Sequence, residues 1–308
     1  MSRRRAGLAV RELGAQFDLE PVQTRYRGHA RELAAASAAQ GYDLVVTFGG
    51  DGTVNEVVNG LMALSVPDCS GDCSGAETRP ALATIPGGGA NVFARTLGLP
   101  AEPAEALRKI LDAARSDSRR TIGLGRAVSS AGQRYFTFSA GLGLPAEVVA
   151  DVERQRASGG KESDLLYMWT AVRHFYTATD RHNPALTLEV AGAPPAGALF
   201  LGVVTNSSPW TYVGSRPVQP APHRDLNSGL DVFGLRRLHT LTTLHALGQM
   251  MHTRSRPLAG RDVVTAVALT DLTLRASRPI AFHIDGEYLG ETEKVAFRHL
   301  PDALSVFA

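Results

Sequence analysis

Cysteines, long apolar runs and an excess of one charge are all scarce or missing in this chain of 308 residues. Its two cysteines, Cys69 and Cys73, stand in a polar, Gly-rich stretch without a neighbouring histidine. A zinc site usually needs four ligands, so we interpret both cysteines as loop residues. No run approaches the ~20 apolar residues of a membrane-spanning helix, and no apolar signal segment follows the N-terminal arginines. We therefore expect a cytoplasmic protein with no transmembrane segment.

Charge is nearly balanced, with 32 basic and 30 acidic side chains and a formal net charge of +2. This balance gives no indication of a nucleic-acid partner. Three arginine-rich spots would favour an anionic surface, although solvated faces are the simpler interpretation: Arg3 to Arg5, Arg119-Arg120 and Arg236-Arg237. The hydrophobic share of 44% is ordinary, and the length suffices for two domains with a large core.

The pattern of elements changes near residue 125. Before it, helices and strands alternate, which predicts a parallel sheet: helix 30–39, the strand before Asp51, a helix from Thr53, strand 81–85 and a helix from Asn91. After it, short β-branched and aromatic runs predict a mostly antiparallel β domain: 135–140, 186–190, 199–205, 230–235, 263–269, 272–276 and 280–284, with helices at 163–178 and 240–253. We predict domains over 1–125 and 126–299, with residues 300–308 returning to the first.

The stretch from Leu44 to Glu56 carries the strongest chemical signal. An apolar strand runs into a Gly-rich corner that contains Asp51, and a helix follows. Glycines let backbone N–H groups approach an anion, and a helix N-terminus adds partial positive charge at the same place. In that helix an apolar stripe at helical spacing should pack on the sheet, while Asn55 and Asn59 face elsewhere. The corner therefore predicts a phosphate site, with a nucleotide as its ligand.

A second Gly-rich corner, Pro86 to Asn91, follows the next strand. Ligands of open α/β sheets bind outside the carboxyl ends of the strands, where both corners fall. Neither corner is a P-loop or a dinucleotide fingerprint, because no G-x-x-x-x-G-K-[ST] is present and no G-x-G-x-x-G precedes an acidic residue at the expected distance. From spacing alone, two plain tight turns remain the alternative.

The third signal is the sequence from His283 to Glu287, where a predicted strand ends in Asp285-Gly-Glu287. Asp-Gly by itself indicates a hairpin turn. A phosphotransferase also needs a proton acceptor and carboxylates that hold magnesium directly or through water, and Asp51, Asp285 and Glu287 could supply both.

Together, Gly49-Gly-Asp-Gly-Thr-Val-Asn-Glu-Val-Val-Asn-Gly-Leu61, Pro86-Gly-Gly-Gly-Ala-Asn-Val-Phe-Ala-Arg-Thr-Leu-Gly-Leu-Pro100 and Asp285-Gly-Glu-Tyr-Leu-Gly290 closely resemble the diacylglycerol kinase catalytic-domain family. That family includes bacterial lipid kinases and sphingosine kinases, and the resemblance runs over essentially the whole chain. It implies a Rossmann-like nucleotide-binding α/β domain joined to an antiparallel β-sandwich domain that binds the lipid, with ATP in the cleft between them.

The resemblance also implies roles for single residues. Glu287 matches the proposed general base, and Asp285 matches a carboxylate of the magnesium–water network. In sphingosine kinases the base role is argued for the position of Asp51, so both candidates stay open. The implied ATP contacts are Thr24, Gly49, Gly50, Asp51, Gly52, Thr53, Val54, Asn55, Gly87, Gly88, Gly89 and Asn91.

The chain departs from the family at three places. Members usually begin with a strand and an Asn-Pro-x-x-Gly phosphate loop, whereas this chain starts at what resembles the residues after that loop; we favour a misplaced start over a lost segment. The implied magnesium ligands are Asn227, where the family usually has Asp, and the carbonyls of Leu230 and Val232. A neutral amide should make this site weaker. Pro145 stands where sphingosine kinases carry Asp, which speaks against an amino-alcohol substrate.

The sequence thus predicts an ATP- and Mg²⁺-dependent lipid kinase at the inner face of the membrane, with diacylglycerol as the favoured substrate and a homodimer left open. Alternatives are a sphingoid-base or other lipid kinase, a relative of NAD kinases, and an inactive nucleotide- or lipid-binding pseudokinase. An apolar helix around 165–176, with Trp210 and Tyr212, would contact acyl chains or simply belong to the core. We expect that Ala in place of Asp285 or Glu287 abolishes transfer and leaves the fold intact.

Overall fold

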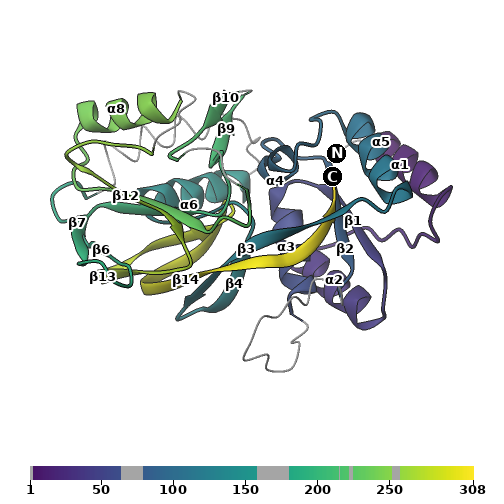
Figure 1. Cartoon of the computed structure of the whole chain (residues 1–308), viewed down its shortest axis with the longest axis horizontal. Coiled ribbons are helices and arrows are strands. Elements are labelled where there is room, and N and C mark those ends of the chain that lie inside the picture. The colour runs from purple at the N-terminus through teal and green to yellow at the C-terminus, as the bar shows by residue number, and fades with distance from the viewer. Residues whose placement is uncertain (1–2, 64–78, 158–179, 215, 222–224, 252–256) are drawn as a thin grey trace. The chain divides into compact units, whose positions relative to one another are not determined.

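The computed structural model describes residues 3–63, 79–157, 180–214, 216–221, 225–251 and 257–308 (Figure 1). Cys69, Cys73 and the predicted helix 163–178 lie outside these residues. The chain divides into two compact units, Met1–Ile122 with Asp302–Ala308, and Gly123–Pro301. The assignment of the predicted ranges 1–125 and 126–299 to nucleotide and lipid binding stays a prediction.

The first unit is an α/β unit with a parallel sheet. Its elements are α1 (Arg3–Gly14), α2 (His29–Ala39), β1 (Leu44–Gly49), α3 (Asp51–Leu61), β2 (Ala81–Pro86), α4 (Val92–Thr96) and α5 (Pro103–Arg115). β1 and β2 are parallel, with Gly49 opposite Pro86, and the carboxyl end of β14 adds a further parallel neighbour to β2. Among the described strands β1 pairs with β2 alone, so it forms the edge of this sheet.

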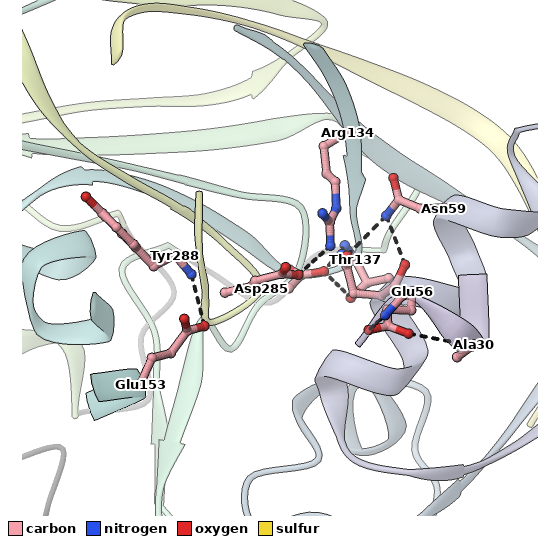
Figure 2. A network of polar contacts seen from close by, with 11 residues as sticks. Ala30, Glu56, Asn59, Arg134, Thr137, Glu153, Asp285 and Tyr288 are labelled. Carbon is pink, nitrogen blue, oxygen red and sulfur yellow. Dashed lines mark hydrogen bonds and ion pairs between the residues drawn. The ribbon is translucent and has the colours of Figure 1, made fainter. Parts of the chain in front are cut away.

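Helix α3 packs closely on α2. A Cβ on Gly60 would run into the carbonyl oxygen of Arg31 and lie 2.7 Å from the Cβ of Ala34, so glycine is required there. The carboxylate of Glu56 accepts hydrogen bonds from the amides of Gly28 (2.8 Å) and Ala30 (3.2 Å), which ties α3 to the start of α2 (Figure 2). The two helices thus form a firm support for the loop that precedes α3.

Two sequence predictions about α3 need correction. The helix begins at Asp51 and not at Thr53. Asn55 and Asn59 are both buried, with 1% and 4% of their surfaces exposed, and do not lie off the packed face. The amide nitrogen of Asn59 donates to the backbone and side-chain oxygens of Asn55, at 2.9 and 3.1 Å. Because the two amides pair with each other, the helix can bury them at little cost.

The second unit is mostly antiparallel. Its elements are β3 (Arg119–Ser129), β4 (Gly132–Phe136), β5 (Ser139–Gly143), α6 (Leu144–Ala157), β6 (Leu186–Glu189), β7 (Ala196–Leu199), β8 (Leu201–Thr205), β9 (Thr211–Val213), β10 (Arg216–Val218), β11 (Leu230–Leu235), α8 (Thr240–Met250), β12 (Val263–Leu269), β13 (Asp271–Ile284) and β14 (Glu287–Phe307). β3 and β14 also reach into the first unit.

Several predicted strands of this unit have different bounds in the structure. The predicted strand 135–140 is broken into β4 and β5, and the predicted runs 272–276 and 280–284 form the single strand β13. Strands β5, β8, β11 and β12 follow β13 in antiparallel order. The predicted fold class, an α/β amino-terminal part with an antiparallel β part, is confirmed.

Two apolar clusters hold the second unit. In one of them Phe136 meets Phe297 edge to face, with ring centroids 6.1 Å apart. The other lies between β8, β11 and α8 and includes Phe233, which meets Trp210 at 5.6 Å. Trp210 therefore belongs to a packing cluster. None of the helices in the described ranges is long and apolar enough to cross a membrane.

Candidate functional site

Two glycine loops lie side by side in the first unit. The first loop, Gly49–Gly52, runs from the last residue of β1 into the first turn of α3, and the second loop, Gly87–Asn91, follows β2. The amide of Gly87 donates to the carbonyl of Gly49 at 2.8 Å. A Cβ on Gly88 would lie 2.7 Å from the Cα of Gly50, so only two glycines allow this approach. The loops thus form one backbone surface at the carboxyl ends of both strands, where such sheets bind ligands.

The second loop is fixed by Asn91. The Asn91 side chain accepts from the amide of Gly88 and donates to its carbonyl, both at 2.9 Å. Asn91 itself adopts the left-handed conformation, with φ 46°, directly before α4. Asparagine tolerates this conformation better than most residues. Asn91 therefore fixes the shape of the loop by binding both the amide and the carbonyl of Gly88.

Asp51 connects the first loop to α4. One carboxylate oxygen accepts from the amide of Val92 and the other from the amide of Phe93, both at 3.0 Å. The carboxylate thus caps α4, where negative charge is favourable. Of the two roles that the sequence left open for Asp51, this geometry favours a positioning role over that of a proton acceptor.

Two loop glycines have no role in packing. Gly52 and Gly89 are exposed, neither has a positive φ, and a Cβ on either would meet no atom within 4 Å. The fold itself would accept a side chain at both positions. A ligand that approaches the backbone closely is a physical reason for glycine there. Since α3 starts in the first loop and directs its N-terminus toward it, the ligand should be an anion.

The other predicted ATP contacts differ in their exposure. Val54 and Asn55 are buried in α3, so their side chains serve helix packing and only their backbone can serve a ligand. The Thr53 side chain covers Gly49, because a Cβ on Gly49 would lie 2.7 Å from the hydroxyl oxygen of Thr53. Thr24 is exposed in the segment between α1 and α2, and no hydrogen bond to either loop is present among the described residues. The ATP contacts stay a prediction, as does the role of Thr24.

In the second unit, Asp285 organises the turn between β13 and β14. Its side chain is buried, with 4% exposed. It accepts hydrogen bonds from the amide and the hydroxyl of Thr137 at 2.7 and 2.8 Å, and from the amides of Phe138 and Ser139 at 3.0 and 2.9 Å (Figure 2). These donors lie where β4 ends and β5 begins. The break in the predicted strand 135–140 therefore directs three backbone amides at this carboxylate.

Glu287 meets a cation that the sequence analysis did not single out. Its carboxylate forms an ion pair with Arg134 of β4, and both side chains are largely buried, with 18% and 21% exposed. One residue further, the amide of Tyr288 donates to Glu153 of α6 at 3.2 Å (Figure 2). Arg134 and Glu153 lie more than a hundred residues from this turn in sequence, and no local pattern pointed to them. The pair holds the Glu287 side chain in one orientation.

His283 is a buried, neutral neighbour of this turn. Only 3% of its surface is exposed, and neither ring nitrogen has a hydrogen-bond partner among the described residues. Burial lowers the pKa of its imidazole to about 4. The ring lies over Gly141 of β5, where a Cβ would come within 2.5 Å of Nε2. His283 therefore packs as an uncharged ring near neutral pH and keeps β13 close to β5.

The segment predicted to hold magnesium offers mostly neutral oxygens. Asn227 is half-buried, and its backbone N–H donates to the carboxylate of the exposed Asp225 at 3.2 Å. Leu230 and Val232 are buried in β11 between β8 and β12. In the described part of the chain no group of three or more His, Cys, Asp or Glu side chains could hold a metal. The two carboxylates at this segment, Asp225 and the buried Asp231, accept hydrogen bonds from the backbone amides of Asn227 and Ala268, so magnesium binding here stays a prediction.

Comparisons with known proteins agree with these features. A sequence profile described as "Diacylglycerol kinase catalytic domain" matches residues 4–123. The diacylglycerol kinase of Bacillus subtilis is 35% identical over 287 residues, which cover 90% of this chain and 81% of that protein. Human sphingosine kinase 2 is 30% identical over 197 residues, 62% of this chain and 29% of that protein.

Two further matches complete the comparison. A Chromohalobacter salexigens protein named "Probable lipid kinase YegS-like" is 38% identical over 146 residues, which span 47% of this chain and 41% of that protein. A solved structure of a diacylglycerol kinase from Bacillus anthracis shares the fold, with a TM-score of 0.67 and 20% identity over 98% of this chain and 90% of that one.

Proposed function

Because the chain belongs to the diacylglycerol kinase catalytic-domain family of lipid kinases, we propose that it transfers the γ-phosphoryl group of ATP to a hydroxyl of a neutral lipid. Diacylglycerol is the acceptor that we favour, and phosphatidic acid is then the product. The relative named diacylglycerol kinase matches 90% of this chain, whereas sphingosine kinase 2 matches 62%. Pro145, at the start of α6, also leaves no carboxylate for a sphingoid amine at that position.

The observation that carries the proposal is the pair of adjoining glycine loops. The amide of Gly89 in the second loop and the N-terminus of α3 would receive the phosphates of ATP. Phosphoryl transfer depends mainly on position and on electrostatic stabilisation, so a rigid backbone surface suits it. Gly52 and Gly89, which no packing contact requires, are where we place the closest approach of the nucleotide.

Glu287 is the group that we propose takes the proton of the lipid hydroxyl. Its ion pair with Arg134 would keep its carboxylate in one place. Asp51 and Asp285, whose oxygens accept several backbone amides, would act by positioning the loops and the turn. Asn227, the carbonyls of Leu230 and Val232, and Asp225 would hold Mg²⁺, which neutralises phosphate charge when bound.

A glycine substitution tests the nucleotide site without disturbing the fold. We expect Gly52→Ala to lower the rate of lipid phosphorylation about tenfold or more, through a higher KM for ATP, because the methyl group faces the phosphates. Its melting temperature should not fall, since Ala is favoured over Gly within a helix by about 1 kcal/mol. Radiolabelled ATP, a panel of lipids that includes diacylglycerol and sphingosine, and extraction of labelled lipid give the measurement.

Gly7→Ala is the matched control, because Gly7 also lies in a helix and a Cβ there meets no atom within 4 Å. Its activity should equal that of the unsubstituted protein. Failure of the unsubstituted protein to label any lipid would refute the proposed function. Equal KM values for ATP in Gly52→Ala and Gly7→Ala would show that the first loop does not contact the nucleotide at Gly52.

A further inference from the structure

Helix α8 carries its apolar residues on both faces. Toward the unit it buries Ala246, Gln249 and Met250, of which Ala246 and Met250 belong to the apolar cluster between β8 and β11. Gln249 also fixes the helix to the following chain, since it donates to the carbonyl of Ala259 at 3.0 Å and accepts from its amide at 3.3 Å. The inward face is therefore fully engaged, and the helix lies at the margin of the second unit (Figure 1).

The outward face of α8 is the unusual one. Its apolar side chains recur at helical spacing and are exposed by 81%, 59%, 44% and 40%: Leu241, Leu244, Leu247 and Met251. These four residues form what we call the apolar face of α8. A surface helix normally presents charged and polar residues to water, yet α8 contains no Asp, Glu, Lys or Arg. A contiguous exposed apolar patch of this kind marks an interaction site.

Basic side chains outnumber acidic ones in the part of the sequence that contains this face. The sequence 232–262 contains five arginines and one acidic residue, Asp262, whereas the whole chain has an excess of only two basic side chains. Among the described arginines, Arg236 is bound to the carbonyl of Gly197 at 2.6 Å. Arg237 is 60% exposed, with Asp262 at 3.4 Å, and Arg261 is exposed without an ion pair in the described part of the chain. Apolar residues flanked by arginines suit an anionic lipid surface.

We infer that the apolar face of α8 is the surface by which this protein docks on the membrane. The leucines enter the boundary between headgroups and acyl chains, while Arg237 and Arg261 approach anionic headgroups. The inference rests on the proposed function in one respect, since a kinase for a membrane-resident lipid must reach that lipid at the bilayer. A protein partner is the less suitable occupant, because α8 has no Trp, Tyr, Phe or Arg to anchor a partner, and its exposed His245 already contacts Gln249 within the helix.

Vesicle binding tests the inference without any turnover. The full chain is mixed with vesicles of equal parts phosphatidylcholine and phosphatidylglycerol, with no ATP and no diacylglycerol, and bound protein is measured by co-sedimentation. We expect Leu241→Ser with Leu244→Ser to weaken binding about tenfold or more, because two exposed leucines lose their burial in lipid. Arg261→Ala should weaken binding about fivefold on these vesicles and leave binding to pure phosphatidylcholine unchanged.

Val128→Ser is the control, because Val128 is a comparably exposed apolar residue of β3, with 42% exposed, outside α8. It should bind like the unsubstituted protein. The double variant should keep its melting temperature, and any kinase activity on diacylglycerol in detergent micelles should equal that of the unsubstituted protein. If the unsubstituted protein labels no lipid and the double variant still loses vesicle binding, the result supports docking and refutes only the proposed function.

Two results would overturn the inference. One is equal vesicle binding by the double variant and the unsubstituted protein. The other is a dimer of the unsubstituted protein, seen by light scattering, that the double substitution splits into monomers while vesicle binding persists. In that case the apolar face of α8 would be covered by a second copy of the chain.

Discussion

The two units build their candidate sites from different materials. In the first unit the glycine loops offer backbone amides, and Asp51 serves them by capping α4. In the second unit the turn after β13 offers carboxylates, of which Asp285 binds backbone amides and Glu287 pairs with the side chain of Arg134. Asp51, Asp285 and Glu287 all follow or precede a glycine in the sequence, yet their carboxylates have different partners in the structure.

This contrast separates groups that position the site from the group that we assign to chemistry. A carboxylate whose oxygens already accept two or more amides is held to its place, and its removal should act mainly on stability. A carboxylate paired with a guanidinium can be replaced by an amide that keeps one acceptor oxygen, so its replacement should cost less stability than that of a carboxylate bound by several amides. The three acidic residues therefore predict three different ratios of lost activity to lost stability.

Glu287→Gln should show the largest effect, and it should fall on activity. We expect phosphoryl transfer to drop by about 10² to 10⁴-fold, the usual contribution of a positioned general base. The free energy of unfolding should fall by about 1 to 2 kcal/mol, because the largely buried Arg134 loses its charged partner but keeps an amide oxygen as hydrogen-bond acceptor. Turnover at saturating ATP and urea denaturation give the two values.

Glu291→Gln is the matched control for this variant, since Glu291 is an exposed residue of the same strand. It should leave both quantities unchanged. Near-normal turnover of Glu287→Gln would remove Glu287 as the proton acceptor and would return that role to Asp51.

Asp285→Asn should act next most strongly, and mainly on the fold. The amide cannot accept all four hydrogen bonds, and its NH₂ group would face backbone N–H groups in a buried place. We expect the free energy of unfolding to fall by about 3 kcal/mol. This revises the sequence-based expectation that a substitution at Asp285 leaves the fold intact. A urea denaturation midpoint equal to that of the unsubstituted protein would contradict this account of Asp285.

Asp51→Asn should have the smallest effect of the three. One of its two bonds to α4 is lost, so stability should fall by about 1 kcal/mol, as for other lost helix caps. Turnover at saturating ATP should fall less than about tenfold, because the base role lies elsewhere in our proposal. A loss of turnover as large as that expected for Glu287→Gln would show that Asp51 also takes part in proton transfer.

The sequence revealed the first unit's site better than the second's. Glycine spacing reports backbone geometry directly, so the two loops and their place after parallel strands were predictable. The partners of the carboxylates were not, because Arg134 and Glu153 reach the turn only through the register of distant strands and a helix that had no strong periodic signal. The break between β4 and β5 was missed for the same reason, since it depends on Asp285, nearly 150 residues away.

The exposed face of α8 shows a further limit. A helix was predicted over 240–253, and α8 spans Thr240–Met250, but a sequence pattern alone cannot tell which side of a helix is buried. Which residues of α8 are buried depends on how the helix packs on β8 and β11. Ala246 and Met250 pack there, and the leucines stay exposed. Only the packed structure identifies the apolar face.

The contact between Gly50 and Gly88 limits how this sequence can change. When two side chains clash in a protein core, a smaller neighbour can usually restore the space. Here each residue faces another glycine, with a Cβ on Gly50 only 3.2 Å from the Cα of Gly88, and no smaller residue exists. A substitution at one position therefore cannot be compensated by a smaller residue at the other. The loops could accept a side chain at Gly50 or Gly88 only by moving apart, which would disrupt the backbone surface that they form together.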